Sequence, residues 1–267
     1  MVKTLACEAR KASSNLVSRL MEISIRAQYS SEYDWGEALR RVVPVGSIEL
    51  AFYDRELFLG KTELDDVVLP IKDLGLQVPT THMASCGLSD IKLFMWILMK
   101  TIQIARAVGC RSIIVHPSNE SVKDFGERYD QIVLPALESY DCDIHWETFA
   151  GKRRSLPAWN KLVAFCGEHG RSYICYDICH MRPSTEKALE DIDTHYDFIR
   201  GFHFSNWKPG GSGGQHLPLE EGVVDYDKII RHLVKTDFQG NITLEYLPQF
   251  HNRLVADALD ILDKVYS

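Results

Sequence analysis

The sequence predicts a single (β/α)8 barrel, and three observations carry that prediction. The chain has 267 residues, close to the roughly 250 typical of this fold. Short runs rich in β-branched or aromatic residues recur about every 25–35 residues, and helix-like segments separate them, which favours βα units around a parallel sheet. Ionisable residues stand near the ends of most of these runs, where barrel enzymes gather their catalytic groups.

The strands are expected to be short and to consist almost entirely of apolar residues. Parallel barrel strands are buried on both faces, so they lack the alternation of a half-exposed strand. The eight predicted strands are 21–27, 47–53, 75–82, 111–116, 143–147, 172–177, 199–204 and 241–246.

The helices between the strands are predicted from apolar residues at helical spacing. The clearest, 89–108, starts with Ser89 as a candidate N-cap and Asp90 in its first turn. Gly109 follows it and suits the C′ position. The other helices are expected at 35–43, 63–74, 125–140, 156–169, 185–198, 226–236 and 252–265.

The composition is that of an ordinary globular protein, with 45% hydrophobic and 25% charged residues. No segment reads as a linker, so one domain over 1–267 is expected, with 1–20 as an N-terminal extension of undetermined role. The net charge of −7 gives no general attraction to nucleic acid or to anionic membranes, and neither is expected as a partner. A homo-oligomer is compatible with the sequence.

The expected compartment is the cytoplasm. The seven cysteines are odd in number and scattered, without a CxxC pair, which is typical of reduced thiols. The first 19 residues lack the apolar core of a signal peptide. The most apolar stretch, 93–99, is too short to span a bilayer.

Polar residues at the strand ends are the main indication of function. A single histidine or glutamate in such a place is more often structural. Seven on one rim converge on a common axis when the barrel closes, and together they favour a functional site. They are Glu49, His82, His116, Glu147, Asp177, His203 and Glu245.

The chemistry of this set indicates a divalent metal ion. Carboxylate and imidazole together suit Zn²⁺, Mn²⁺, Co²⁺ or Fe²⁺ better than Ca²⁺. We expect one bound ion, with manganese, zinc, cobalt and magnesium all open. Cys179 lies between Asp177 and His180, and it is interpreted as a buried, inert thiol.

The motifs around these residues resemble the xylose isomerase-like barrel superfamily, from about residue 47 to residue 246. A glutamate is followed shortly by glycine at 147–151, an Asp-x-x-His motif occupies 177–180, and a His-x-Pro-like stretch begins at His216. The resemblance implies that one metal ion is held by Glu147, Asp177, His203 and Glu245.

The resemblance also implies an activity on a small carbohydrate. Relatives include isomerases and epimerases that move a proton beside a carbonyl through an enediolate, for which Glu147 and Glu245 are the natural acid–base pair. The further residues expected near the substrate are His180, His82, His116, His216 and Glu49. His180 could instead support Asp177, and Glu49 could instead pair with Arg55.

Two other activities remain open at this stage. A dehydratase of a keto-inositol or similar keto acid would use the same first proton abstraction. A zinc-dependent apurinic-site endonuclease would match His82 and His116 as extra metal ligands, but it adds an aspartate where this chain has Gly214. No basic segment interleaved with aromatic residues favours DNA. A non-catalytic sugar-binding barrel would require a decayed metal site, yet all four ligands are present.

Several further features lie near the predicted rim. The glycine-rich stretch 209–214 could bind phosphate or serve as a lid, and Arg153 and Arg154 are interpreted as solvated surface charges. Ser205, Asn206 and Trp207 follow His203 where many members of the resembled superfamily carry an acidic residue, which could alter the support of the metal ligands or the choice of substrate. His145 shares a strand face with Glu147 and is expected to be a satisfied interior residue.

Overall fold

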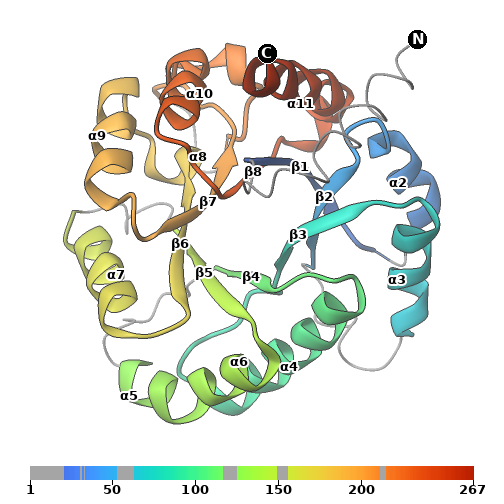
Figure 1. Ribbon diagram of the computed structural model, residues 1–267, viewed down its shortest axis with the longest axis vertical. Coiled ribbons are helices and arrows are strands. Elements are labelled where there is room, and N and C mark those ends of the chain that lie inside the picture. Colours follow the sequence, from blue (N-terminus) through green and yellow to red (C-terminus); the bar gives the residue numbers. More distant parts are fainter. Residues whose placement is uncertain are drawn as a thin grey trace.

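The structure is a computed structural model, and it describes residues 21–30, 32, 34–52, 63–116, 125–148, 156–210 and 215–267. Eight parallel strands pair in chain order, and the last pairs with the first to close a barrel (Figure 1). The strands are β1 (Glu22–Gln28), β2 (Ser47–Ala51), β3 (Gln77–His82), β4 (Ser112–Val115), β5 (Asp143–Glu147), β6 (Ser172–Asp177), β7 (Ile199–Phe204) and β8 (Asn241–Leu244). The predicted fold and all eight predicted strands are confirmed.

Helices surround the barrel as an outer ring (Figure 1). The segment expected as one helix over 125–140 is α5 (Gly126–Arg128), a π-helix (Tyr129–Val133) and α6 (Leu134–Tyr140) in succession. The remaining helices are α2 (Trp35–Val42), α3 (Leu64–Asp73), α4 (Ile91–Ala107), α7 (Leu156–Glu168), α8 (Ile178–Met181), α9 (Thr185–His195), α10 (Tyr226–Lys235) and α11 (His251–Tyr266). No described helix is long and apolar enough to cross a membrane.

Two details of the helices differ from expectation. The N-cap of α4 is Asp90, whose carboxylate accepts from the Leu93 N–H, and not Ser89. The short helix α8 was not predicted, because a single turn is too short to show periodicity. Asp177 caps it by accepting from the His180 N–H at 2.8 Å, so the last residue of β6 also positions the side chain of His180.

The interior of this barrel is polar, whereas branched apolar side chains fill the interior of most barrels of this fold. Thr80 and Thr243 each donate a hydrogen bond to Glu49 Oε2, at 2.9 and 3.1 Å. Asn241 Nδ2 in turn donates to Thr243 Oγ1 at 2.7 Å. The alternate strand residues, such as Ile48 and Leu50, belong to the apolar core. The inward face of the strands therefore carries a hydrogen-bonded network.

Candidate metal centre

Four ligand residues of the predicted metal site converge at the C-terminal ends of adjacent strands. Glu147 ends β5, Asp177 ends β6, His203 lies in β7 and Glu245 follows β8. Each offers one donor atom, and these atoms lie within 4.8 Å of one another. His203 Nδ1 is 3.1 Å from Glu147 Oε1, 3.3 Å from Glu245 Oε2 and 3.6 Å from Asp177 Oδ2. The barrel thus brings together residues that lie far apart in the sequence.

The donor set fits a divalent cation. Three carboxylates surround His203, and Asp177 Oδ2 is buried with no hydrogen-bond partner among the described residues. Buried like charges are strongly destabilising unless a cation compensates them. Burial opposes a charge on His203, but Cys175, Glu49 and Glu147 raise its pKa well above the ordinary value, so the metal-free imidazole carries a proton on both nitrogens. When an ion binds, loss of the Nδ1 proton would leave Nε2, which lies 3.2 Å from Glu49 Oε2, as the donor. This tautomer is the one that a metal-bound histidine needs.

The ionisation of these groups follows from their proximity. Burial opposes ionisation of the carboxylate of Glu147, but the adjacent His203 and His180 hold its pKa well below the usual range. Burial likewise opposes charge on Glu245, yet Arg26, followed by His216 and His203, lowers its pKa to about 2. Both glutamates are therefore anionic at neutral pH.

Arg26 on β1 is a site residue that the sequence analysis missed. Its guanidinium forms an ion pair with Glu245 Oε2, and its Nε lies 3.8 Å from Glu49 Oε1. The side chain is 8% exposed. The sequence did contain an indication of this role, because an arginine inside a predicted buried strand requires a partner of opposite charge. With Arg26 included, all eight strands carry an ionisable residue at this end of the barrel.

Two of the residues expected near substrate are buried against candidate metal ligands. Glu49 is fully buried and contacts His203, Thr80 and Thr243. His82 is 2% exposed, and its Nε2 lies 2.9 Å from Glu147 Oε2. Its Nδ1 can donate to the Met83 carbonyl oxygen at 3.1 Å. These contacts suit residues that orient the ligands.

The other three expected residues form a row beside the four ligands. The ring centroids of His116 and His180, and those of His180 and His216, are each 5.5 Å apart. His180 Nδ1 lies 3.0 Å from the Thr148 carbonyl oxygen and can donate to it. His216 Nδ1 is 3.0 Å from Ser205 Oγ. His116 and His180 are half-buried, so they can meet a molecule that enters from the rim.

The histidine row creates two further groups of potential ligands. Donor atoms of His116, Glu147 and His180 lie within 4.8 Å of one another, and so do those of Asp177, His180 and His216. Burial lowers the pKa of His116, with Glu147 opposing, which favours the neutral imidazole that binds metals. The geometry accommodates one cation among the four ligands and leaves room for others along the row.

Asn206 makes four side-chain hydrogen bonds with the backbone around it. Its Nδ2 donates to the carbonyl oxygens of Leu219 and Val224, and its Oδ1 accepts from the N–H groups of Trp207 and Val224. A carboxylate cannot donate those bonds. Asn206 therefore fixes the segment that follows His216.

Two further expectations can be compared with the structure. Cys179 Sγ accepts from the His216 N–H at 3.3 Å, and burial, aided by Asp177, raises the thiol pKa to about 11, as an inert thiol requires. His145, expected to be a satisfied interior residue, differs: its Nδ1 is buried without a hydrogen-bond partner in the described part of the chain. The predictions for Arg55, Arg153, Arg154, Gly214 and the extension 1–20 fall outside the described residues.

Comparison with known proteins agrees with the fold. The model of the family described as xylose isomerase-like TIM barrel matches residues 45–265. A protein from Shouchella clausii named probable endonuclease 4 is 22% identical over 247 residues, covering 73% of this chain and 84% of its own length.

Solved structures with the same architecture carry different activities. The 3-keto-D-glucoside 4-epimerase of E. coli superposes with a TM-score of 0.66 and 15% identity, covering 91% of this chain and 99% of its own. A xylose isomerase-like barrel protein of Mycobacterium smegmatis, in complex with magnesium, has a TM-score of 0.67 and 14% identity, with coverages of 92% and 98%. At such identities the similarity establishes the fold alone.

Proposed function

The chain belongs to the xylose isomerase-like TIM barrel family, and from this premise we propose that it is a metal-dependent isomerase or epimerase of a small sugar, sugar phosphate or related keto-polyol. The observation that carries the proposal is the position of two glutamates around one point. Glu147 and Glu245 come from non-adjacent strands, and both carboxylates approach His203 Nδ1, at 3.1 and 3.3 Å. Two ionised carboxylates beside one binding point suit removal and return of a proton.

The proton transfers would be performed by the two glutamates. One carboxylate removes the proton from the carbon next to the substrate carbonyl, and the electron pair of the C–H bond moves into an enediolate. The other, once it has taken a proton from solvent, then delivers that proton to the opposite face of that carbon, which gives an epimer and leaves this second carboxylate ionised. Delivery to the neighbouring carbon gives the isomer. A divalent ion held by Glu147, Asp177, His203 and Glu245 would act, when bound, as a Lewis acid toward the negative charge on oxygen.

The histidine row would orient the substrate. His180 Nδ1 is engaged with the Thr148 carbonyl oxygen, so its Nε2 remains available for a substrate hydroxyl. His116 and His216 flank it and can contact neighbouring hydroxyls. Glu49 and His82 would act behind the ligands, by holding His203 and Glu147 in place.

A second candidate, a zinc-dependent apurinic-site endonuclease, rests on the overlapping ligand groups. Glu147, Asp177 and His180 each belong to two of these groups, so the rim could hold more than one ion. The name of the Shouchella clausii relative points the same way. Against it stand the net charge of −7 and the glycine at position 214. A count of bound zinc and cleavage of an abasic-site duplex would separate this candidate from the first.

The decisive experiment follows solvent deuterium into substrate. Manganese-, zinc- or magnesium-loaded protein is incubated in D2O with ketoses, ketose phosphates and keto-inositols, and proton NMR monitors the carbon next to the carbonyl. Exchange accompanied by an epimer or isomer supports the proposal, whereas loss of water identifies a dehydratase. Glu147→Gln and Glu245→Gln should each abolish exchange while the circular dichroism spectrum is unchanged. Near wild-type turnover in either variant would exclude the two-glutamate mechanism.

A further inference from the structure

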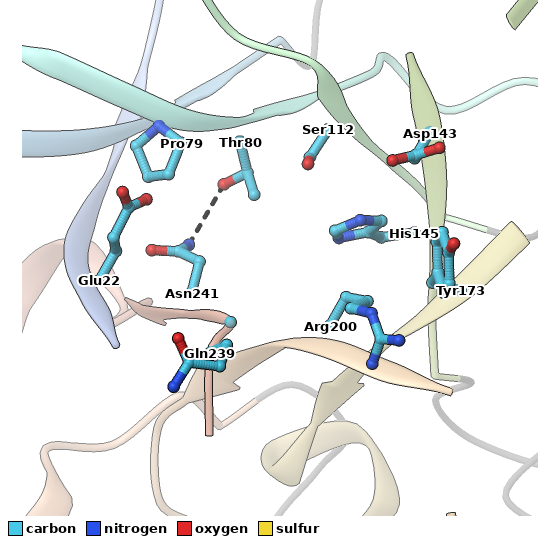
Figure 2. A pocket seen from close by; sticks show the side chains of 11 residues that line it. Glu22, Pro79, Thr80, Ser112, Asp143, His145, Tyr173, Arg200, Gln239 and Asn241 are labelled. Atoms are coloured by element: carbon cyan, nitrogen blue, oxygen red, sulfur yellow. Dashed lines mark hydrogen bonds between the residues drawn. The ribbon is translucent and has the colours of Figure 1, made fainter. Parts of the chain in front are cut away.

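A cavity lies at the opposite end of the barrel from the metal centre. Its volume of about 540 Å³ falls within the range of small-molecule sites. Residues from the starts of strands line it, including Asp143, the first residue of β5, and Asn241, the first of β8 (Figure 2). Glu147 ends the same strand β5, about 13 Å along the strand from Asp143 and two residues after His145, which also lines the cavity.

Two buried polar atoms in the cavity wall lack partners. Asn241 Oδ1 and His145 Nδ1 make no hydrogen bond among the residues that the structure describes. Their residues are only 6% and 5% exposed. Figure 2 shows the two side chains on opposite sides of an open centre. Because an unpartnered buried polar atom is destabilising, a molecule that supplies the missing hydrogen bonds would bind favourably there.

Neighbouring residues leave these atoms available. The amide nitrogen of Asn241 is already committed to the hydroxyl groups of Thr243 and Ser24, at 2.7 and 3.2 Å. The amide oxygen lies on the side of Glu22, another residue of the lining (Figure 2). Gly201 on β7 has no side chain, and a Cβ at that position would lie 3.9 Å from His145 Nδ1.

The charges of the wall indicate the class of ligand. Arg200 is stacked over the Tyr173 ring, with 4.9 Å from its Cζ to the ring centroid, while Glu22 and Asp143 bring carboxylates. Because the lining carries both positive and negative side chains, it does not favour a multiply charged ion. Hydroxyl groups can donate to an amide oxygen and either donate to or accept from an imidazole nitrogen, so they match both unpartnered atoms.

We propose that this cavity is a second binding site, for a neutral polyhydroxylated molecule the size of a monosaccharide or sugar alcohol. Hydroxyl groups of the ligand bond to Asn241 Oδ1 and to His145 Nδ1. Among the described residues, none that lines the cavity belongs to the candidate metal ligands, and its wall meets the metal centre through the hydrogen bonds from Asn241 to Thr80 and from Thr80 to Glu49.

The test is isothermal titration of the full-length, EDTA-treated protein with D-sorbitol, D-glucose and myo-inositol. At least one of the three should bind saturably. His145→Phe keeps a ring against Tyr173, whose centroid is 5.8 Å away, but removes the nitrogens, and it should weaken binding about tenfold or more. Ser112→Phe, which fills the cavity, should abolish binding. Glu168→Gln, an exposed change at the end of α7 outside the cavity lining, is the matched control and should bind normally.

The variant Glu147→Gln separates this site from the metal centre. Binding that survives Glu147→Gln and is lost in Ser112→Phe supports the proposal. Binding that is lost in Glu147→Gln and is unaffected by the two cavity variants would place the ligand at the metal centre and overturn it. Absence of saturable binding by all three probes to the wild-type protein would also overturn it. Circular dichroism of each variant verifies folding, and Ser112→Phe and His145→Phe serve as alternatives if one of them is unstable.

Discussion

Arg26 on β1 forms an ion pair with Glu245, the carboxylate that follows β8, across the seam where the barrel closes. The pair joins the first and last strands at the metal centre. It also places a permanent cation beside one of the two proposed proton-transfer groups. This arrangement lowers the pKa of Glu245 to about 2, so Glu245 is a weak base in the absence of metal.

Arg26→Met should destabilise the metal-free protein by about 3 kcal/mol at pH 7, because it leaves Glu245 buried without its cation. In the wild-type protein the pKa of Glu245 is depressed, so its stabilising contribution is present above about pH 4.5 and is lost as pH falls toward about 2. In the variant the pKa of Glu245 rises and protonation relieves the unpaired charge. The decrease in the free energy of unfolding caused by Arg26→Met should therefore be smaller at pH 4 than at pH 7.

Urea unfolding at the two pH values measures this difference. Arg40→Met is the matched control, because Arg40 pairs with Glu37 on the exposed surface of α2 and should contribute less than about 1 kcal/mol. Equal costs of Arg26→Met at pH 4 and pH 7 would contradict the assignment of the effect to Glu245.

Glu49→Gln should weaken metal binding about 10- to 100-fold without unfolding the protein, as is common for groups that orient a ligand. The carboxylate of Glu49 accepts from His203 Nε2 at 3.2 Å and thereby fixes the tautomer of that ligand. Competition with a chromogenic zinc chelator measures the affinity. An unchanged affinity would show that His203 does not depend on Glu49.

Metal removal should lower the thermal midpoint of unfolding. Glu147, Asp177 and Glu245 are crowded around His203, and a bound cation relieves their repulsion. A metal present at about 100 times its dissociation constant contributes about 2.7 kcal/mol, or roughly 5–10 °C for a domain of this size. Differential scanning fluorimetry with EDTA and with added zinc or manganese measures the shift. Asp177→Asn should show a smaller shift, and an equal one would argue against Asp177 as a ligand.

Asn206→Asp should destabilise the protein by about 2–3 kcal/mol, because the new carboxylate faces the carbonyl oxygens of Leu219 and Val224 in place of a donor. The segment after His216 should become more sensitive to limited proteolysis. Lys235→Ala, on the exposed end of α10, is a control that should leave both properties unchanged. A stable Asn206→Asp variant with unaltered proteolysis would contradict the anchoring role of Asn206.

The sequence by itself determined the architecture and the end of the barrel where the site lies. Apolar runs separated by amphipathic segments predicted eight strands, because burial on both faces leaves few polar positions in a parallel strand. The polar residues that remained, such as Glu147 at the end of β5 and His203 in β7, could be assigned to one rim from their place along each strand.

Only the tertiary structure decided which of those residues meet. Glu49 and His82 belong to the rim by sequence, yet their partners His203 and Glu147 are supplied by strands far along the chain. Arg26 contacts Glu245 only because β8 pairs with β1, a closure that no local pattern encodes. The cavity at the other end of the barrel is also decided by the tertiary structure, because whether a polar atom lacks a hydrogen-bond partner depends on the positions of all its neighbours. Periodicity along one strand specifies the face and the level of a side chain, whereas its contacts depend on the register between strands.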